Sequence, residues 1–332
     1  MEVLAVSSNG FSVTPVAPPG NGLHALAAPD FLYRYRRHRY WLHAALLIAT
    51  ILSTTIVGAG LASAFAANRP FDFANDLYGA NGVYVRVWRD PAYMLAGLPF
   101  SLTLLTILLA HEFGHYLAAR YYGVDVTLPF FLPAPTLFGT MGAFIRIRSA
   151  ILSRRVLFDI GVAGPLAGFA VLVWFLAAGL SLSKIVPGMA LRGDLIFGTP
   201  LALGLLEKLV FPGASAADIA LHPVARAAWM GLLATALNLL PIGQLDGGHI
   251  LYAFIGERTK WLSRVFVVIL VPLGIFFAYM WLVWALLLFF FGMRHPMIVD
   301  PAPLDRARRW LGFAALVIFV LSFTAAPIRP NL

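Results

Sequence analysis

Two histidines flank a glutamate in the segment His111-Glu112-Phe113-Gly114-His115. Residues four apart share one face of an α-helix, so both imidazoles could bind the same metal ion. Glu112 is adjacent and could accept a proton from a water molecule bound to that ion. The spacing H-E-x-x-H therefore predicts a zinc site with its own water-activating base.

The setting of this motif strengthens the prediction. A largely apolar run, Leu102 to Ala110, which contains two threonines but no ionisable residue, leads directly into it. A charged side chain at the middle of a membrane costs about 2.5 to 3.5 kcal/mol, and a bound metal ion offsets that cost. The alternative places both histidines at a helix end, with Glu112 paired to Arg120 or Arg146. The apolar run favours the metal site.

A third ligand is expected in another span, because a catalytic zinc takes three protein ligands and a water molecule. Asp246 is the candidate, within NLLPIGQLDGGH at 238 to 249, where Pro241 and three glycines break the helix and let backbone approach an ion. An aspartate that caps a turn is the alternative interpretation. Three other acids lie close to expected membrane boundaries and fit less well: Asp159, Asp218 and Glu257.

Two further polar residues of this stretch have open roles. Asn238 could donate its amide to a developing oxyanion or to substrate backbone, or form an ordinary hydrogen bond between helices. His249 could support a ligand or bind the ion itself. Two histidines and an aspartate accept several divalent ions, and the H-E-x-x-H context favours one zinc ion per chain.

The composition is that of a membrane protein. Of the 332 residues, 60% are hydrophobic and 12% charged, against about 25% charged in a soluble domain. Apolar runs of about 20 residues, long enough to cross a bilayer, recur after residue 40. The net charge of +9 comes from Lys and Arg in short loops, which indicates topology rather than nucleic-acid binding. Cysteine is absent, which excludes thiolate ligands and a cysteine nucleophile.

We expect an all-α polytopic membrane protein with six to seven transmembrane helices. Residues 1–30 form a disordered cytoplasmic tail, and residues 31–332 form one membrane-embedded domain with its core at 92–254 and C-terminal helices at 261–326. Basic residues before the first span place the N-terminus on the cytoplasmic side of a cell membrane. The expected spans are 41–66, 92–120, 156–183, 224–254 and 310–326, with a re-entrant or interfacial segment at 195–211 and a helical hairpin at 261–292.

Two local patterns carry further expectations. The small residues of GVAGPLAG at 161 to 168 would let a neighbouring helix approach closely, and Pro165 should bend or locally open its own helix. Residues 139–147 alternate in polarity and predict a short membrane-associated β element. Its edge could hold an extended substrate by β-augmentation, or the segment could be an ordinary hairpin.

These motifs resemble the site-2 protease family of intramembrane zinc metalloproteases. The similarity rests on HEFGH at 111 to 115 and LDGG at 245 to 248. It extends to PFFLP at 129 to 133, GTMGAFIRI at 139 to 147, VAGPLAG at 162 to 168 and HPVARAAWMGLLATALNLLPIGQLDGG at 222 to 248, which are similar to the plastid gravitropism-deficient-type branch. The resemblance implies His111, His115 and Asp246 as zinc ligands, Glu112 as the catalytic base, and Asn238 as the family's site asparagine.

The resemblance also implies a function, namely cleavage of membrane-spanning protein substrates within the lipid bilayer. The substrate helix must unwind locally, because a helix occupies its peptide carbonyls with its own hydrogen bonds. Members commonly carry a PDZ domain, but the segment 184–223 is too short to hold one.

Three other classes of protein compete with this interpretation. A non-catalytic zinc-binding membrane protein descended from a protease would not need Glu112. A metal transporter predicts further ionisable residues along the spans, and the apolar run before His111 has none. Another H-E-x-x-H peptidase would need a glutamate as third ligand, for which Glu207 is the only other mid-chain candidate.

Overall fold

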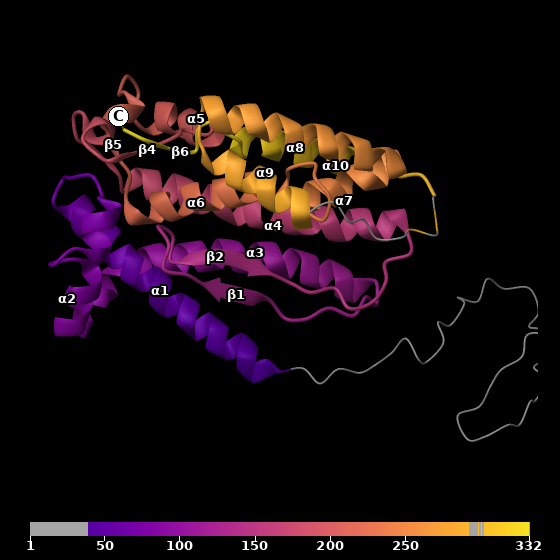
Figure 1. Ribbon diagram of the computed structural model, residues 1–332, viewed down its shortest axis with the longest axis horizontal. Coiled ribbons are helices and arrows are strands. Elements are labelled where there is room, and N and C mark those ends of the chain that lie inside the picture. Colours follow the sequence, from indigo (N-terminus) through magenta and orange to yellow (C-terminus); the bar gives the residue numbers. More distant parts are fainter. Residues whose placement is uncertain (1–38, 292–297, 299, 301, 332) are drawn as a thin grey trace, which may run out of the picture. The chain divides into compact units, whose positions relative to one another are not determined.

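The computed structural model describes residues 39–291, 298, 300 and 302–331. The tail expected at 1–30 and most of the basic cluster before the first span lie outside these residues. The described chain is mostly helical (Figure 1). Its α-helices are α1 (Tyr40–Ala66), α2 (Val83–Arg89), α3 (Leu98–Tyr121), α4 (Arg154–Ser181), α5 (Leu201–Val210), α6 (Pro223–Asn238), α7 (Asp246–Ile255), α8 (Thr259–Phe276), α9 (Met280–Phe291) and α10 (Arg306–Ser322).

Four helical stretches of the described chain are long and apolar enough to cross a membrane: Tyr40–Ala66, Pro91–Tyr121, Arg154–Ser181 and Asp246–Phe276. The first three lie within two residues of the spans expected at 41–66, 92–120 and 156–183. Helices α6, α9 and α10 are shorter, at 16, 12 and 17 residues. The six to seven crossings therefore stay a prediction.

The span expected at 224–254 is two helices instead of one. Helix α6 ends at Asn238, and α7 begins at Asp246. Between them, Pro241 has no backbone N–H, and Gly243 adopts a positive φ of 49°. The break that Pro241 and the glycines predict is complete enough to end one helix and start another. Asp246 thus stands at the first turn of a new helix.

The C-terminal apolar run forms the expected helical hairpin. Helices α8 and α9 pack against each other, and the turn falls after Phe276, not at Pro272, which lies inside α8. Gly274 permits the contact, because a Cβ there would lie 2.5 Å from Leu282 Cγ. The segment expected to be re-entrant or interfacial at 195–211 contains a strand and the 10-residue helix α5. At about 15 Å, α5 is too short to cross ~30 Å of hydrocarbon.

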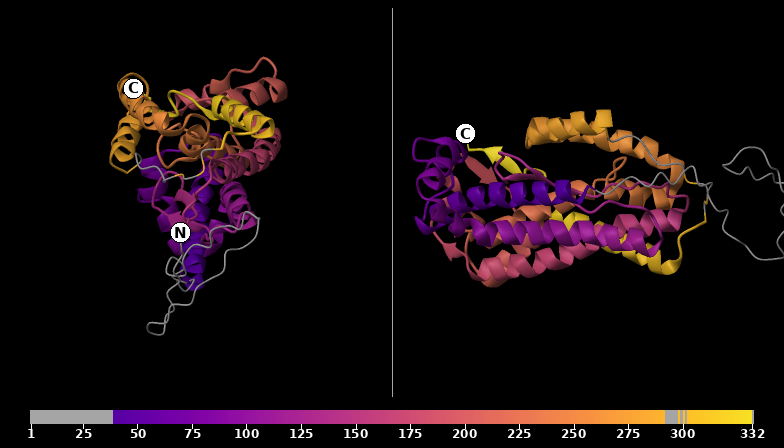
Figure 2. Two further views of the ribbon diagram at one scale, coloured as in Figure 1. Left: turned by 90° about the vertical axis from the view of Figure 1, so that its right-hand side faces the viewer. Right: turned by 90° about the horizontal axis from the view of Figure 1, so that it is seen from below.

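The core of the described chain centres on α4, which packs against both α3 and α6 (Figures 1 and 2). The contact with α6 is close, because a Cβ on Gly179 would lie 2.3 Å from Ala225 N. Helix α4 continues through Pro165, so the expected bend does not interrupt it. The main cluster of buried side chains includes Leu172 and Leu176 on α4 and Trp229 on α6.

Short antiparallel strand pairs complete the described fold: β1 (Phe130–Pro133) with β2 (Thr140–Phe144), β3 (Lys184–Ile185) with β5 (Ile219–Ala220), and β4 (Leu195–Phe197) with β6 (Ile328–Pro330). Strand β1 packs against α1 and β2 against α3. A further bridge joins Val126 to Ile147. The β element predicted at 139–147 is therefore present as β2 and its extension.

Glu207 on α5 gives the fold a pH dependence. Its side chain is buried, and burial raises the pKa of its carboxyl to about 7. An unfolded glutamate titrates near 4.3, so ionising Glu207 opposes folding. Its unfavourable contribution is absent below about pH 4, grows as the pH rises, and is complete above the folded-state pKa.

We therefore expect the free energy of unfolding to fall by about 2 to 3 kcal/mol between pH 5 and pH 8 because of this one group. Thermal unfolding in detergent at several pH values measures it. In Glu207→Gln this part of the slope should disappear, whereas Glu257→Gln, at an exposed side chain, should keep it. Equal slopes in the wild type and Glu207→Gln would refute the assignment.

Candidate metal centre

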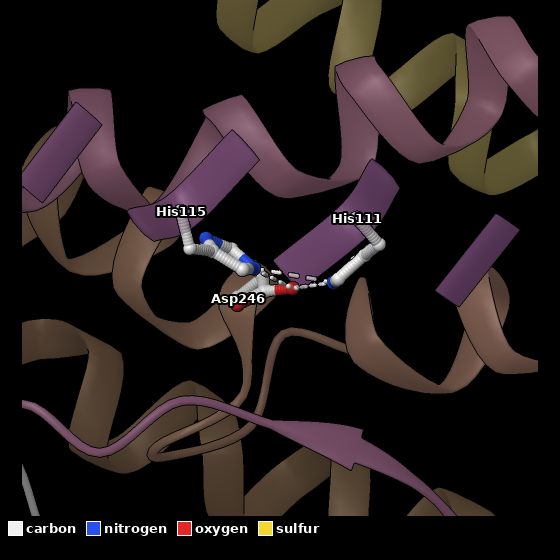
Figure 3. Close-up of side chains that lie close together, drawn as sticks. All are labelled: His111, His115 and Asp246. Atoms are coloured by element: carbon white, nitrogen blue, oxygen red, sulfur yellow. Dashed lines mark hydrogen bonds and ion pairs between the residues drawn. The ribbon is translucent and has the colours of Figure 1, made fainter. Parts of the chain in front are cut away.

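His111, His115 and Asp246 converge on one point, although Asp246 is 135 residues from His111 in the chain (Figure 3). The histidines lie one turn apart on α3, and Asp246 opens α7. Asp246 Oδ2 lies 3.1 Å from His111 Nε2 and 3.3 Å from His115 Nε2, and the two imidazole nitrogens lie 3.1 Å apart. Each residue thus turns one donor atom toward the other two, and these atoms lie within 4.8 Å of one another.

This donor set fits a zinc ion. Tetrahedral ligands at about 2.0 to 2.1 Å from zinc lie about 3.3 Å from one another. The three separations of 3.1, 3.3 and 3.1 Å match that geometry. Two imidazole nitrogens and one carboxylate oxygen also leave the fourth position open, as a catalytic zinc requires.

Glycines of α4 make room for the two imidazoles. A Cβ on Gly164 would lie 2.1 Å from His115 Nε2, and a Cβ on Gly168 would lie 2.9 Å from His111 Cβ. On the α3 side, a Cβ on Gly114 would lie 2.5 Å from the carbonyl oxygen of Ala163. The close helix approach predicted for 161–168 is therefore found, and it falls at the histidines.

The tight loop before α7 depends on two more glycines. A Cβ on Gly247 would lie 2.1 Å from the carbonyl oxygen of Leu239, and a Cβ on Gly248 would lie 2.3 Å from that of Gly243. The loop can fold back onto the first turn of α7 only if both positions lack a side chain. This explains why two glycines directly follow Asp246.

A backbone carbonyl orients His115. Its Nδ1 lies 2.7 Å from the carbonyl oxygen of Ile160 on α4. Donation from Nδ1 fixes the tautomer and leaves the Nε2 lone pair facing Asp246 and His111. The sequence gives no signal for this contact, because any residue type could supply the carbonyl.

The acids that the sequence analysis ranked below Asp246 have other partners. Asp159 accepts hydrogen bonds from Arg308 Nη2 at 2.6 Å and from the hydroxyl of Tyr122 at 2.5 Å. Asp218 accepts from the Gly188 amide at 2.6 Å. Glu257 forms an ion pair with Lys260. Among the described residues, none of the three belongs to the cluster with the histidines.

Asn238 and His249 both reach the same region. The Nδ2 atom of Asn238, at the end of α6, lies 3.2 Å from His111 Nε2, so its amide group is next to the three donor atoms. His249 follows Asp246 on α7 and lines the same cavity, but it is outside the cluster of three donor atoms.

A cavity of about 230 Å³ adjoins the three donor atoms. Glu112 lines it from α3 and is buried. No ion pair joins Glu112 to Arg120 or Arg146 among the described residues, so the alternative considered for the motif has no support there. A further part of the lining comes from β2 and the residues after it, and from Gln244, which no sequence motif singles out. The strand side contributes Ala143, Phe144, Ile145 and Ile147.

A buried pair of histidines and an aspartate, beside a glutamate and on membrane-length helices, defines the class of helical membrane metallopeptidases. The chain matches Peptidase family M50 over residues 99–281, more than half of its length, and it belongs to that family. The match contains α3, α4, α6 and α7, and thus every residue of the centre.

Curated relatives agree with this family. The chain is 34% identical over 252 residues to the protein "Probable zinc metalloprotease EGY1, chloroplastic" of Oryza sativa subsp. japonica, covering 72% of this chain and 42% of that protein. It is 38% identical over 175 residues to the Arabidopsis thaliana protein of the same name, covering 49% and 31%. It is 31% identical over 239 residues to "Probable zinc metalloprotease EGY2, chloroplastic" of Arabidopsis thaliana, covering 70% and 42%. The chain spans less than half the length of these relatives.

Proposed function

We propose that this protein is an intramembrane zinc metalloprotease that cleaves membrane-spanning protein substrates. The observation that carries the proposal is the convergence of His111, His115 and Asp246 within 4.8 Å, beside a cavity that Glu112 also lines. Three ligands with an open position suit a catalytic zinc rather than a structural one. The relatives named as probable zinc metalloproteases support the same activity.

The side chains then have distinct roles. His111, His115 and Asp246 hold one zinc ion per chain. A zinc ion held there would supply an acidified water molecule and a Lewis acid for the substrate carbonyl. Glu112 would take the proton of that water and give it to the leaving amine. Asn238 donates its amide N–H to the carbonyl oxygen that gains negative charge.

The edge of β2 is suited to hold the substrate. The carbonyl oxygen of Arg146 accepts a hydrogen bond from the Thr127 amide at 3.0 Å, and the amide of Arg148 donates one to the carbonyl oxygen of Asp125 at 2.8 Å. Successive peptide groups of a strand point to opposite edges, so those of Ile145 and Ile147 face away from this partner segment. Both residues line the cavity with Glu112. A locally unwound substrate could therefore pair with this edge and present a peptide bond to the centre.

Substitution of Ala143 by proline tests this edge. By the same alternation, the Ala143 amide faces the substrate side, and proline would remove its N–H. We expect the initial rate of cleavage in proteoliposomes to fall about tenfold, since one lost hydrogen bond and a distorted edge cost about 1 to 2 kcal/mol. Ala143→Ser keeps the amide and nearly the same side-chain volume, and it should cleave at close to the wild-type rate. Equal cleavage rates in the two variants would show that the edge of β2 does not bind the substrate.

The proposed activity has a direct test. The purified chain is reconstituted with a set of single-span proteins, and cleavage is followed with and without a zinc chelator. We expect at least one substrate to be cut within its membrane segment, with loss of cutting on chelation and recovery on adding zinc. Cleavage that persists after the metal is stripped would refute the proposal.

We further propose that residues 31–332 form one membrane-embedded domain in a cell membrane with the N-terminus in the cytoplasm. Helices of membrane length support the location. The orientation follows from the basic residues before α1. Because the chain has no cysteine, single cysteines placed in its loops report each loop's side by labelling with an impermeant reagent. If cysteines placed before α1 were labelled from outside the cell, the N-terminus would lie outside and the proposed orientation would be wrong.

A further inference from the structure

Helices α7, α8 and α10 enclose a second cavity, with a volume of about 470 Å³. Its walls are almost entirely apolar, and the residues that line it differ from those of the metal-site cavity. Among the described residues of its lining, Arg309 is the one charged side chain. The cavity is therefore an apolar groove with a single cation.

Arg309 lies at one end of a continuous row of groove-lining residues on α10. Arg309, Gly312, Phe313, Leu316 and Phe319 follow one another at helical spacing and all line the groove. From Arg309 to Phe319 the helix rises about 15 Å, which is half of the ~30 Å hydrocarbon thickness. The groove thus has the depth of one leaflet of a bilayer.

The start of α10 has the features of a membrane–water boundary. Arg306 and Arg309 are exposed there, and Trp310 is 62% exposed beside them. Tryptophan and basic residues gather at that depth in membrane proteins. The side chain of Arg308 forms an ion pair with Asp159, whereas that of Arg309 has no hydrogen bond or ion pair to another described residue.

We propose that this groove binds one acyl chain of an anionic phospholipid, with the lipid phosphate on Arg309. A guanidinium without a carboxylate partner matches a phosphate, and the apolar walls match the chain. A transmembrane helix of another protein fits less well, because it is about 30 Å long and fills roughly 3,000 Å³. This inference needs no metal ion and does not depend on the proposed protease activity.

The groove also touches the segment that delivers Asp246. Leu239 and Pro241, from the loop between α6 and α7, line it together with Gly247. A bound acyl chain would pack against the reverse side of this loop. The lipid therefore stabilises the loop in the conformation that the structure shows.

The test uses the full chain in phosphatidylcholine nanodiscs that contain a phosphatidylglycerol with a photoreactive group in one acyl chain. After irradiation, mass spectrometry locates the labelled residues. We expect labelling to concentrate on the groove-lining faces of α7, α8 and α10. Arg309→Gln should lower it about fivefold, since one basic residue near an anionic lipid contributes about 1 kcal/mol. Arg306→Gln, at an exposed arginine outside the lining, should not change it.

A second pair of variants tests the walls. Leu316→Trp fills the groove and should abolish the concentrated labelling, whereas Val317→Trp, at an exposed neighbour outside the lining, should leave it intact. Each variant must elute as the wild type does on gel filtration. Uniform labelling of all lipid-facing helices, or equal effects within either pair, would overturn the proposal. Preferential labelling of the groove by a photoreactive single-span peptide would also overturn it and assign the groove to a helix.

Discussion

Replacement of Glu112 by glutamine is expected to lower the cleavage rate by about 10² to 10⁴-fold. Glutamine has nearly the same shape but cannot accept a proton at neutral pH, so the change removes proton transfer and little else. Glu112 is buried and lines the cavity beside the three donor atoms without being one of them. Zinc content should therefore stay at one ion per chain. Cleavage of a reconstituted substrate and metal analysis of the same preparation measure both quantities.

The matched control is Glu207→Gln, a second buried glutamate that does not line the metal-site cavity. It should cleave at close to the wild-type rate. If Glu112→Gln cleaved normally, Glu112 would not be the base, and the non-catalytic alternative would gain support. If it lost zinc together with activity, Glu112 would have a structural role in holding the centre.

The second large effect is expected at a residue with no reactive group. Gly164→Ala should abolish zinc binding and lower cleavage to background, because its new Cβ would lie 2.1 Å from His115 Nε2. The imidazole cannot move away from this Cβ without losing its hydrogen bond, because its Nδ1 lies 2.7 Å from the carbonyl oxygen of Ile160. Either α3 and α4 separate or His115 turns away, and in both cases the donor atoms no longer converge.

Zinc analysis of purified Gly164→Ala measures this effect, with gel filtration to confirm that the protein is folded. Gly168→Ala should be milder, because its Cβ would be 2.9 Å from His111 Cβ. Gly204→Ala on α5 serves as control, since its nearest neighbour, Thr199 Cγ2, would be at an ordinary 3.4 Å. A full complement of zinc in Gly164→Ala would argue that His115 is not a ligand.

The first three spans could be predicted from the sequence because each is a long apolar run with polar residues at both ends. The pairing of His111 with His115 follows equally directly from the α-helical period. Both predictions depend on residues close together in the chain. The structure places the corresponding helices within two residues of the expected spans.

Features that depend on contacts between distant segments are harder to predict from the sequence. The apolar stretch from 224 to 254 has the length of one span. Pro241 and the glycines predict a break in it, but only the structure shows that the break ends α6 at Asn238 and starts a new helix at Asp246. Zinc chemistry predicts an acidic ligand, but the 3.1 Å separation between Asp246 Oδ2 and His111 Nε2 is a property of the fold. The small residues at 161–168 predict a close helix approach, but the sequence does not show that Gly164 makes room for His115 or that the Ile160 carbonyl contacts the same imidazole, because both depend on how the helices pack.

Zinc content of the detergent-purified chain, compared with Asp246→Ala, tests the proposed centre most directly, because it needs no substrate. The proposed centre predicts about one zinc ion per chain in the wild type and a large loss in Asp246→Ala, since two histidines alone leave the ion short of one of its three protein ligands. No zinc in the wild type, or the same zinc content in Asp246→Ala, would contradict the assignment of His111, His115 and Asp246 as its ligands.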